Sequence, residues 1–339
     1  MPSVIIDKKI TYSRFGGLYR KLNNASAIKR ARSSCSHQNY TTTDIKNFCH
    51  EYYKDYDNFS MIYWDDLLDF TFIRNHIRVI NRGHDFNLET LKNLFGKNIY
   101  YFKETKRYGF QYFDMINTTR SLGNKFDDKF FISEFQSRNE KLLHFGSLHG
   151  SSRIILDDNK NKDFLNKVKK NLKFNHPKLI LCIKRIIKEL GGLKNYIGVH
   201  IRTGETTIDD KMFRDIFNNT TDTIFEQVNY YFLNGKFDNM KCLESKRPVI
   251  YLATDAKNPR QTFRNFYSTF EPCIFSMSNF EHHLNIINNL TTTYDNYNLK
   301  NFFIPLVDLL VISGGGYFVG TNLSTFSKVA KEIHTFQIT

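Results

Sequence analysis

The sequence predicts an α/β protein with a parallel sheet whose two faces are covered by helices. Three short strand-like runs, at residues 196–205, 247–255 and 317–320, alternate with longer segments in which apolar residues recur at helical spacing. The β-branched and aromatic residues of these runs suit central strands of a parallel sheet. Each run ends in polar residues. Because ligands of open α/β sheets bind beyond the carboxyl ends of the strands, we expect the functional groups there.

The length and charge of the chain limit its organisation and its partners. A chain of 339 residues is enough for two domains, which we predict as residues 1–160 and 161–339, with the polar, aperiodic stretch 157–163 between them. The formal net charge of +14 suits an anionic partner such as a nucleotide or a nucleic acid. The lysines are scattered rather than clustered, which favours a solvated surface over a nucleic-acid interface.

The cysteine pattern and the absence of long apolar runs predict a reduced, cytoplasmic protein. The five cysteines are widely spaced and form no Cys-x-x-Cys, so neither a disulfide framework nor a zinc site is indicated. No stretch reaches the roughly 18 apolar residues of a membrane span, and the first residues contain no apolar leader segment. If the sequence is a fragment of a longer protein, the ER or Golgi lumen is the alternative location.

The amino-terminal half contains fewer clear elements. Gly16 and Gly17 predict a turn before a helix, because paired glycines permit positive φ and close approach of a ligand to the backbone. Apolar residues at helical spacing predict a helix within residues 61–82. Residues 142–155 predict a strand followed by a loop.

The carboxyl-terminal half predicts a regular alternation of helices and strands. A helix is expected to begin at Pro177, a favourable first-turn residue, and to stop at the glycine pair after Leu190. Further helices are predicted at residues 164–172, 213–232, 257–270 and 303–313, followed by one that ends near residue 333, and a fourth strand at residues 273–275.

Polar residues follow each of the main predicted strands. His200, Arg202 and Glu205 emerge from the first strand, and an Arg there offers a fixed fork of donors for a phosphate. Asp255 follows the second strand. Ser324 lies before the last helix, whose amino-terminal amides and dipole suit an anion. An ordinary strand end and a simple helix cap are the structural alternatives for these residues.

No metal site is predicted. Asp55 and Asp57 form an Asp-x-Asp pair, but the residues before them resemble a helix rather than the strand that a metal-binding pair of this kind needs. His282 and His283 lie in an Asn-rich stretch without companion ligands, which indicates solvated side chains.

Several of these segments together resemble the fucosyltransferase superfamily, which includes protein O-fucosyltransferases and α1,6-fucosyltransferases. Three motifs match in order: Gly-Val-His-Ile-Arg at 198–202, Tyr-Leu-Ala-Thr-Asp at 251–255, and Phe-Val-Gly-Thr-Asn-Leu-Ser-Thr-Phe-Ser at 318–327. The stretch 65–73 is also similar to the O-fucosyltransferase branch. The resemblance covers most of the chain, and its carboxyl-terminal half is the more specific.

The resemblance implies a GT-B architecture, in which two Rossmann-like domains face a cleft. Residues 1–160 would lie on the acceptor side, and residues 161–339 would bind the nucleotide sugar GDP-fucose. By position, Arg202 would bind the donor diphosphate and Asp255 would lie near the nucleoside. The other binding residues implied are His200 and Asp308 for the guanine or ribose, Ser324 and Thr325 for phosphate oxygens, and Gly16, Gly17 and Asn23 in the amino-terminal loop.

The resemblance also implies an inverting, metal-independent reaction, because an Arg and helix-end amides neutralise the leaving diphosphate. Thr203 stands where the α1,6 branch has a second Arg, and Ala256 replaces a second acid common in that branch. Glu205 stands where that branch has Asp, and Asp210 falls where it has a Glu proposed as the general base. Arg202, Asp210 and Glu205 are therefore the expected catalytic residues.

The expected function is transfer of fucose from GDP-fucose to a hydroxyl of a glycan or protein, without a cofactor. One alternative keeps the fold and uses GDP-mannose, UDP-xylose or UDP-glucose. A second is a non-catalytic nucleotide-sugar-binding module, favoured by the missing second Arg. A nucleic-acid binder rests on charge alone and is not expected.

Overall fold

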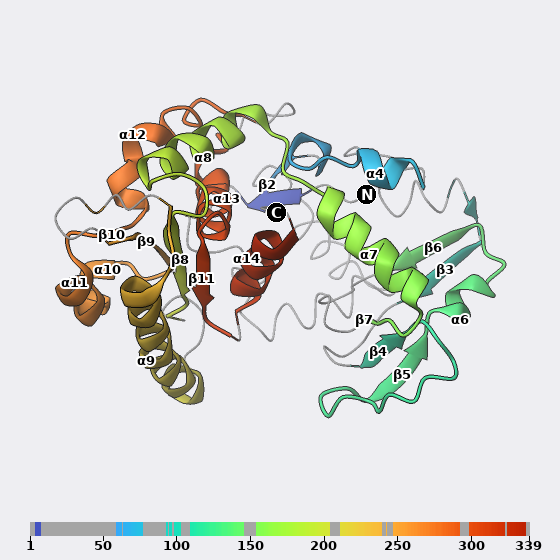
Figure 1. Ribbon diagram of the computed structural model, residues 1–339. Helices are drawn as coiled ribbons and strands as arrows, with labels where there is room; N and C mark the ends of the chain where they lie inside the picture. Colours follow the sequence, from blue (N-terminus) through green and yellow to red (C-terminus); the bar gives the residue numbers. More distant parts are fainter. Residues whose placement is uncertain are drawn as a thin grey trace, which may run out of the picture. The chain divides into compact units, whose positions relative to one another are not determined.

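The computed structural model describes residues 4–7, 59–62, 64–76, 93, 95–96, 98–102, 109–145, 154–203, 211–238, 242, 247–291, 298–322 and 324–336. The chain is mixed α/β with parallel sheets, as the sequence predicts, and it divides into two compact units (Figure 1). Unit 1 comprises residues 70–172 together with the first two residues of the chain, and unit 2 comprises residues 3–69 and 173–339.

Unit 2 contains a four-stranded parallel sheet with the strand order of a Rossmann half. Its strands are β8 (Tyr196–Ile201), β9 (Val249–Thr254), β10 (Ile274–Phe275) and β11 (Tyr317–Gly320), arranged in the order β10-β9-β8-β11. The first strand along the chain therefore lies next to the fourth, and the direction of the crossovers reverses between β8 and β11.

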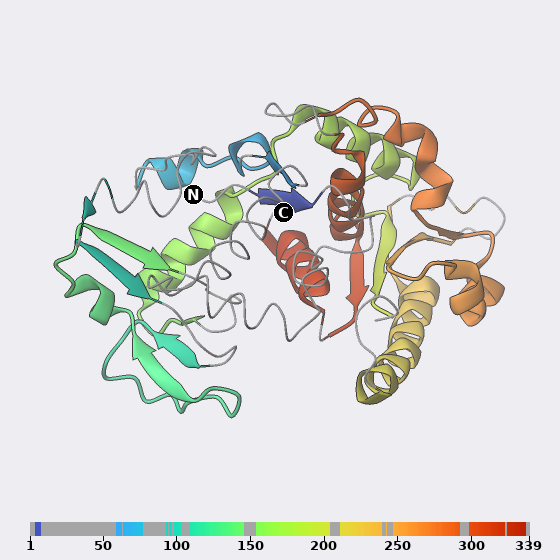
Figure 2. The ribbon, with the colours of Figure 1, turned by 180° about the vertical axis from the view of Figure 1, so that it is seen from behind.

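Helices cover both faces of this sheet (Figures 1 and 2). On one face lie α8 (Pro177–Glu189), α13 (Lys300–Ser313) and α14 (Thr325–Phe336), and on the other α9 (Lys211–Asn234) and α11 (Arg264–Phe270). Successive side chains of a strand point to opposite faces of the sheet. Tyr196 therefore packs in the hydrophobic core beneath α8 and α13, and Ile197 packs in the core beneath α9 and α11. All six residues of β8 are buried, as expected of a central strand.

Gly198 allows helix α13 to pack directly on β8. A Cβ atom at this position would lie 2.0 Å from the carbonyl oxygen of Ile312 in α13, far closer than atoms can approach. Gly198 also pairs with Tyr251 of β9 and Phe318 of β11. A glycine is therefore required here by the packing of the helix against the centre of the sheet.

The helix ends of unit 2 follow the sequence signals, with one exception. Helix α8 begins at Pro177, as predicted, and the imidazole of His176 accepts a hydrogen bond from the Leu179 amide. After the helix, Gly191 and Gly192 take positive φ values of 109° and 99°. The predicted basic helix at 257–270 is instead divided at Phe263 into α10 (Pro259–Thr262) and α11.

Unit 1 contains two small parallel sheets within its described residues. Strand β3 (Ile99–Phe102) pairs with β6 (Leu142–Phe145), and β4 (Phe110–Phe113) lies between β5 (Asp128–Phe131) and β7 (Ile154–Ile155). Phe102, Tyr112 and Phe130 form its aromatic core. The described strands do not form one continuous Rossmann sheet, so the two-domain GT-B arrangement remains a proposal.

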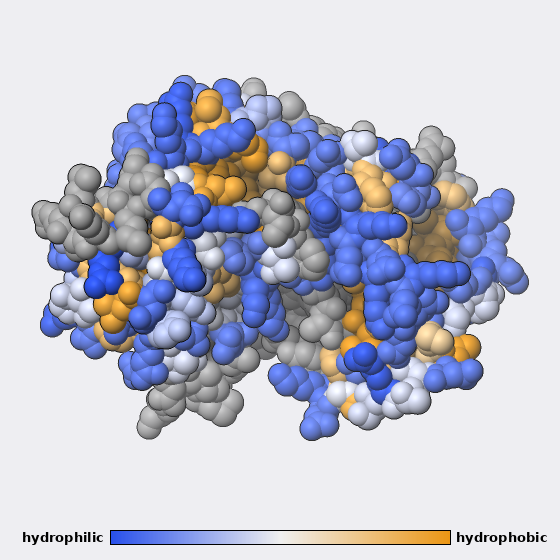
Figure 3. All heavy atoms as spheres, viewed as in Figure 1, coloured by the Kyte–Doolittle hydropathy of each residue, from blue (hydrophilic) through white to orange (hydrophobic). Residues whose placement is uncertain are grey.

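Helix α7 (Asn159–Asn171) contains the predicted domain boundary at residues 160–161. The polar stretch 157–163 was expected to be irregular, but Asp158 caps the helix by accepting a hydrogen bond from the Lys160 amide. The helix packs against α4 (Thr71–Arg74) through the rings of Phe72 and Phe164. Figure 3 shows mainly hydrophilic residues over this part of the surface, although Phe164 and Leu165 of α7 are also exposed. The polar first turn of α7 therefore resembles a linker in sequence.

The predicted helix within residues 61–82 is mostly absent from the described part of that range. Residues Phe59–Ile62 form strand β2, which pairs antiparallel with β1 (Val4–Asp7). A 3-10 turn at Trp64–Asp66 and the four-residue α4 follow. Pairing with β1, more than 50 residues earlier in the sequence, makes Met61 and Ile62 part of a strand rather than a helix.

The prediction of reduced cysteines is wrong for two of them. Cys242 and Cys273, which are 31 positions apart in sequence, form a disulfide with their Cα atoms 5.3 Å apart. The carbonyl of Cys273 accepts a hydrogen bond from Ile250 of β9, so the sheet itself brings this cysteine to its partner. Cys182 is a buried free thiol, and burial raises its pKa to about 11.

No helix within the described residues has the length and apolar character needed to cross a membrane.

Substitution of Gly198 by Ala should destabilise the protein by more than about 2 kcal/mol, because the added methyl group forces β8 and α13 apart. Urea denaturation of the variant and the wild type measures this loss. Gly123→Ala is the control, since a Cβ there meets its nearest neighbour, Phe126, at an ordinary 3.4 Å. Equal losses in the two variants would contradict the proposed packing constraint.

Candidate functional site

A polar site lies at the carboxyl ends of β8 and β11, where the order of the strands reverses. Arg202 follows β8 and Thr321 follows β11. The amide of Arg202 donates to the hydroxyl of Thr321 over 3.0 Å, and the amide of Thr321 donates to the carbonyl of His200 over 3.1 Å. These bonds hold the two strand ends together, at the point where open α/β sheets bind their ligands.

Asp255 orients Arg202. Following β9, its carboxylate lies 3.1 Å from Nε of Arg202 and also accepts hydrogen bonds from the amide and hydroxyl of Thr203, over 2.7 and 3.0 Å. The Asp255 side chain is only 10% exposed, whereas that of Arg202 is 30% exposed. The ion pair involves Nε, one of several donor groups of the guanidinium. The carboxylate therefore fixes a partly exposed cation at the end of the sheet.

His200 is a buried, neutral imidazole. Its Nδ1 lies 2.7 Å from the hydroxyl of Ser327, and its ring lies against that of Phe326, with centroids 4.6 Å apart. The pKa of His200 is lowered to about 4, chiefly by burial; the carboxylate of Asp255 opposes this shift, and the positive charge of Arg202 adds to it. At neutral pH, His200 offers hydrogen bonds but no charge.

Ser324 and Thr325 lie at the start of α14, next to these strand ends. The amide of Ser324 donates to the carbonyl of Thr321, and its hydroxyl is 3.5 Å from the amide of Ser327, the position of a helix cap. Ser324 is buried, and Thr325, the first helical residue, is exposed. The amino-terminal end of this twelve-residue helix carries the partial positive charge that attracts anions.

Asp308 is held in the core by a tyrosine. It lies in the middle of α13, is 4% exposed, and accepts a hydrogen bond from the hydroxyl of Tyr251 in β9 over 2.6 Å. The contact links the helix to the sheet beneath it. This contact of Asp308 with Tyr251 is separate from the pair that Arg202 and Asp255 form at the strand ends.

Five of the predicted site residues lie outside the described part of the chain. They are Gly16, Gly17, Asn23, Glu205 and Asp210. Asp55 and Asp57 also lie outside it. The general base therefore stays a prediction.

The structure adds four residues that the sequence analysis did not select. Thr321 joins the strand ends, Phe326 and Ser327 surround His200, and Tyr251 holds Asp308. All four stand inside the quoted motifs, so the signal was present. Their roles depend on contacts with segments 57 to 127 residues away in sequence, which the motif alone does not reveal.

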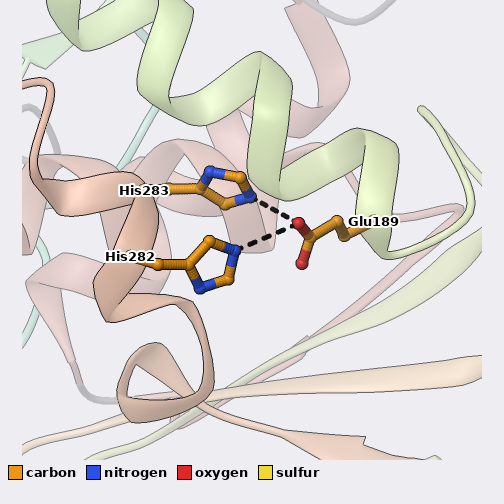
Figure 4. A group of neighbouring side chains, drawn as sticks. All are labelled: Glu189, His282 and His283. Carbon is orange, nitrogen blue, oxygen red and sulfur yellow. Dashed lines mark hydrogen bonds and ion pairs between the residues drawn. The ribbon is translucent and has the colours of Figure 1, made fainter.

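The expectation that His282 and His283 have no companion ligand is wrong. Glu189, the last residue of α8, places one carboxylate oxygen beside the Nε2 atoms of both rings (Figure 4). The two histidines belong to α12 (Glu281–Leu284), which packs against α8. The sequence separation of more than 90 residues hides this cluster from motif analysis.

The fold of unit 2 and its site define an α/β protein with a Rossmann-type parallel sheet and a basic, helix-capped site at its switch point. No family model matches the chain, and no curated protein matches it. Among solved structures, the chain is similar to the crystal structure of POFUT1 in complex with GDP, with 13% identity, coverage of 83% of this chain and 82% of that one, and a TM-score of 0.41. Values this low do not establish a shared fold or activity.

The low pKa of His200 should make stability depend on pH. Unfolded His200 takes up a proton near its ordinary pKa of 6.5, but folded His200 does so only near 4. Its contribution is therefore complete above pH 6.5 and is lost as the pH falls toward 4. Between pH 7 and pH 5, the wild type should lose about 2 kcal/mol more than His200→Gln, measured by denaturation at each pH. Parallel pH profiles would contradict a neutral, buried His200.

Proposed function

We propose that this protein is a glycosyltransferase that binds a nucleotide sugar at the carboxyl ends of β8 and β11. The observation that carries the proposal is the pairing of Arg202 with Asp255 beside the amino-terminal end of α14. An oriented guanidinium and the amino-terminal end of a helix are groups that bind a diphosphate. We further propose GDP-fucose as the donor and a hydroxyl of a glycan or protein as the acceptor, as the motif resemblance implies.

In the proposed reaction, the acceptor oxygen attacks the anomeric carbon from the face opposite the diphosphate. The bond from that carbon to the diphosphate oxygen breaks, so the configuration inverts and GDP leaves. Arg202 and the first amides of α14 stabilise the charge that develops on the leaving group, without a metal or cofactor. Asp210 or Glu205 accepts the proton of the acceptor hydroxyl.

The described contacts suggest supporting roles for the other site residues. Asp255 holds the guanidinium of Arg202 in position, which reduces the reorganisation needed when the diphosphate charge develops. His200 is neutral and adds no second cation. We assign Asp308 to the nucleoside side of the proposed site, and the hydrogen bond from Tyr251 fixes its position between α13 and β9.

A binding module without turnover is the second candidate. It is favoured by Thr203, which occupies the place of a second Arg and uses its hydroxyl to bind Asp255. The same site with GDP-mannose, UDP-xylose or UDP-glucose is the third, since the described groups are suited to the diphosphate rather than the sugar.

The disulfide bears on location. A bond between Cys242 and Cys273 is maintained in oxidising compartments and reduced in the cytosol. We therefore favour the lumen of the ER or Golgi over the cytoplasm predicted from the sequence.

Calorimetry with GDP-fucose, GDP-mannose, UDP-xylose and UDP-glucose should show the tightest binding for GDP-fucose, and transfer should persist in EDTA. If another nucleotide sugar binds more tightly, it takes the place of GDP-fucose as the proposed donor. Binding without transfer to any glycan or protein acceptor would support the non-catalytic binding module. A strict metal requirement would exclude the proposed mechanism.

Arg202→Ala should weaken GDP binding by about 10- to 100-fold, the value of losing charge-assisted hydrogen bonds to a phosphate. Arg260→Ala is the matched control, because this exposed Arg of α10 pairs with Glu271 away from the strand ends. Its GDP affinity should stay within about twofold of the wild type. Full GDP affinity in Arg202→Ala would remove the central residue of the proposal.

A further inference from the structure

Glu189, His282 and His283 form a cluster that the proposed transfer reaction does not use. Glu189 ends α8, just before the turn that leads into β8, whereas Arg202 lies beyond the opposite end of that strand. The two histidines follow the 3-10 helix Met277–Phe280. The cluster is therefore separate from the polar site at the strand ends.

The backbones that carry the three side chains are anchored in the core. Ile186, one turn before Glu189, is fully buried, and Leu284, directly after the histidines, is 3% exposed. The thiol of Cys182 in α8 also lies 3.5 Å from the carbonyl of His283. The side chains thus meet because two packed helices bring them together, and not through a chance contact of mobile surface groups.

The geometry of the cluster is that of ligands around one point (Figure 4). Oε1 of Glu189 lies 2.7 Å from Nε2 of His283 and 3.2 Å from Nε2 of His282. The ligand atoms of all three residues lie within 4.8 Å of one another. Ligand atoms around a tetrahedral zinc, with bonds of about 2.0–2.1 Å, stand roughly 3–3.5 Å apart, so small rotations of these side chains would admit an ion.

The chemistry of the three side chains also suits a cation, because carboxylate oxygens and imidazole nitrogens are zinc ligands. Each Nε2 atom that faces the carboxylate oxygen either carries a hydrogen and donates it, or offers a lone pair that can bind a metal ion.

We propose that Glu189, His282 and His283 bind a divalent transition-metal ion, with zinc as the ion that best fits two imidazoles and one carboxylate. The three ligands leave a coordination position for water. The side chains of Glu189 and His282 are 45% and 58% exposed, which gives the ion access from solvent, while His283 is 12% exposed.

A bound ion would fasten α12 to the end of α8. Helix α12 continues directly from Phe280, whose ring lies 5.9 Å from that of Tyr251, the residue that holds Asp308. The ion would stabilise the folded state without taking part in the transfer step, because it lies apart from Arg202. Removal of the metal should therefore lower the thermal stability while transfer, where measured, persists.

The test uses the full chain without an affinity tag, freed of metal by a chelator and then titrated with Zn²⁺ by calorimetry and by thermal denaturation. The wild type should bind one Zn²⁺ ion at the cluster. Its Tm should rise by about 5 °C or more when the free Zn²⁺ concentration is a hundredfold above Kd. Co²⁺ should bind at the same site and develop the visible absorption that is typical of tetrahedral coordination.

His282→Ala and Glu189→Gln should each weaken this binding by at least about tenfold and abolish most of the Tm gain. His76→Ala is the matched control, an exposed histidine that follows α4 and whose described contacts are with Phe72 and Phe164, and it should bind as the wild type does. In EDTA, all the variants and the wild type should unfold at similar temperatures. Unchanged Zn²⁺ affinity in the two cluster variants, or no binding by the wild type, would show a hydrogen-bonded cluster only.

Discussion

The central position of β8 is the constraint on which unit 2 depends. This strand pairs with β9 on one side and β11 on the other, and all six of its residues are buried. Parallel neighbours can be joined only by long crossovers, so the helices on both faces follow from this arrangement. Gly198 sets the distance between the sheet and α13. The same strand then delivers Arg202 to the edge where the order of the strands reverses.

The polar site is a set of charges held in place before any ligand arrives. The carboxylate of Asp255 accepts from Thr203 and pairs with Arg202, while a hydroxyl of Thr321 binds the Arg202 amide. Side chains fixed in this way do not have to reorganise when charge develops on a leaving group. Burial keeps His200 neutral, so the positive charge is concentrated on the one guanidinium and the helix end.

Several motif residues have structural rather than chemical roles. Gly198 permits close packing, Tyr251 joins β9 to α13, and Ser324 caps α14. A motif match therefore reflects both the scaffold and the chemistry, and it does not separate the two. Arg202 differs from these residues because it is charged, partly exposed and oriented at a strand end.

The sequence by itself determined the α/β class, the strands and helices of the carboxyl-terminal half, and the placement of Arg202 and Asp255 at strand ends, because periodicity, caps and glycines act over a few residues. Tertiary structure decided the pairing of β1 with β2, the Cys242–Cys273 disulfide and the Glu189 cluster. Each of these joins segments 31 or more residues apart. Local patterns carry no information about such partners, since only the packing of the whole sheet and its helices brings them together.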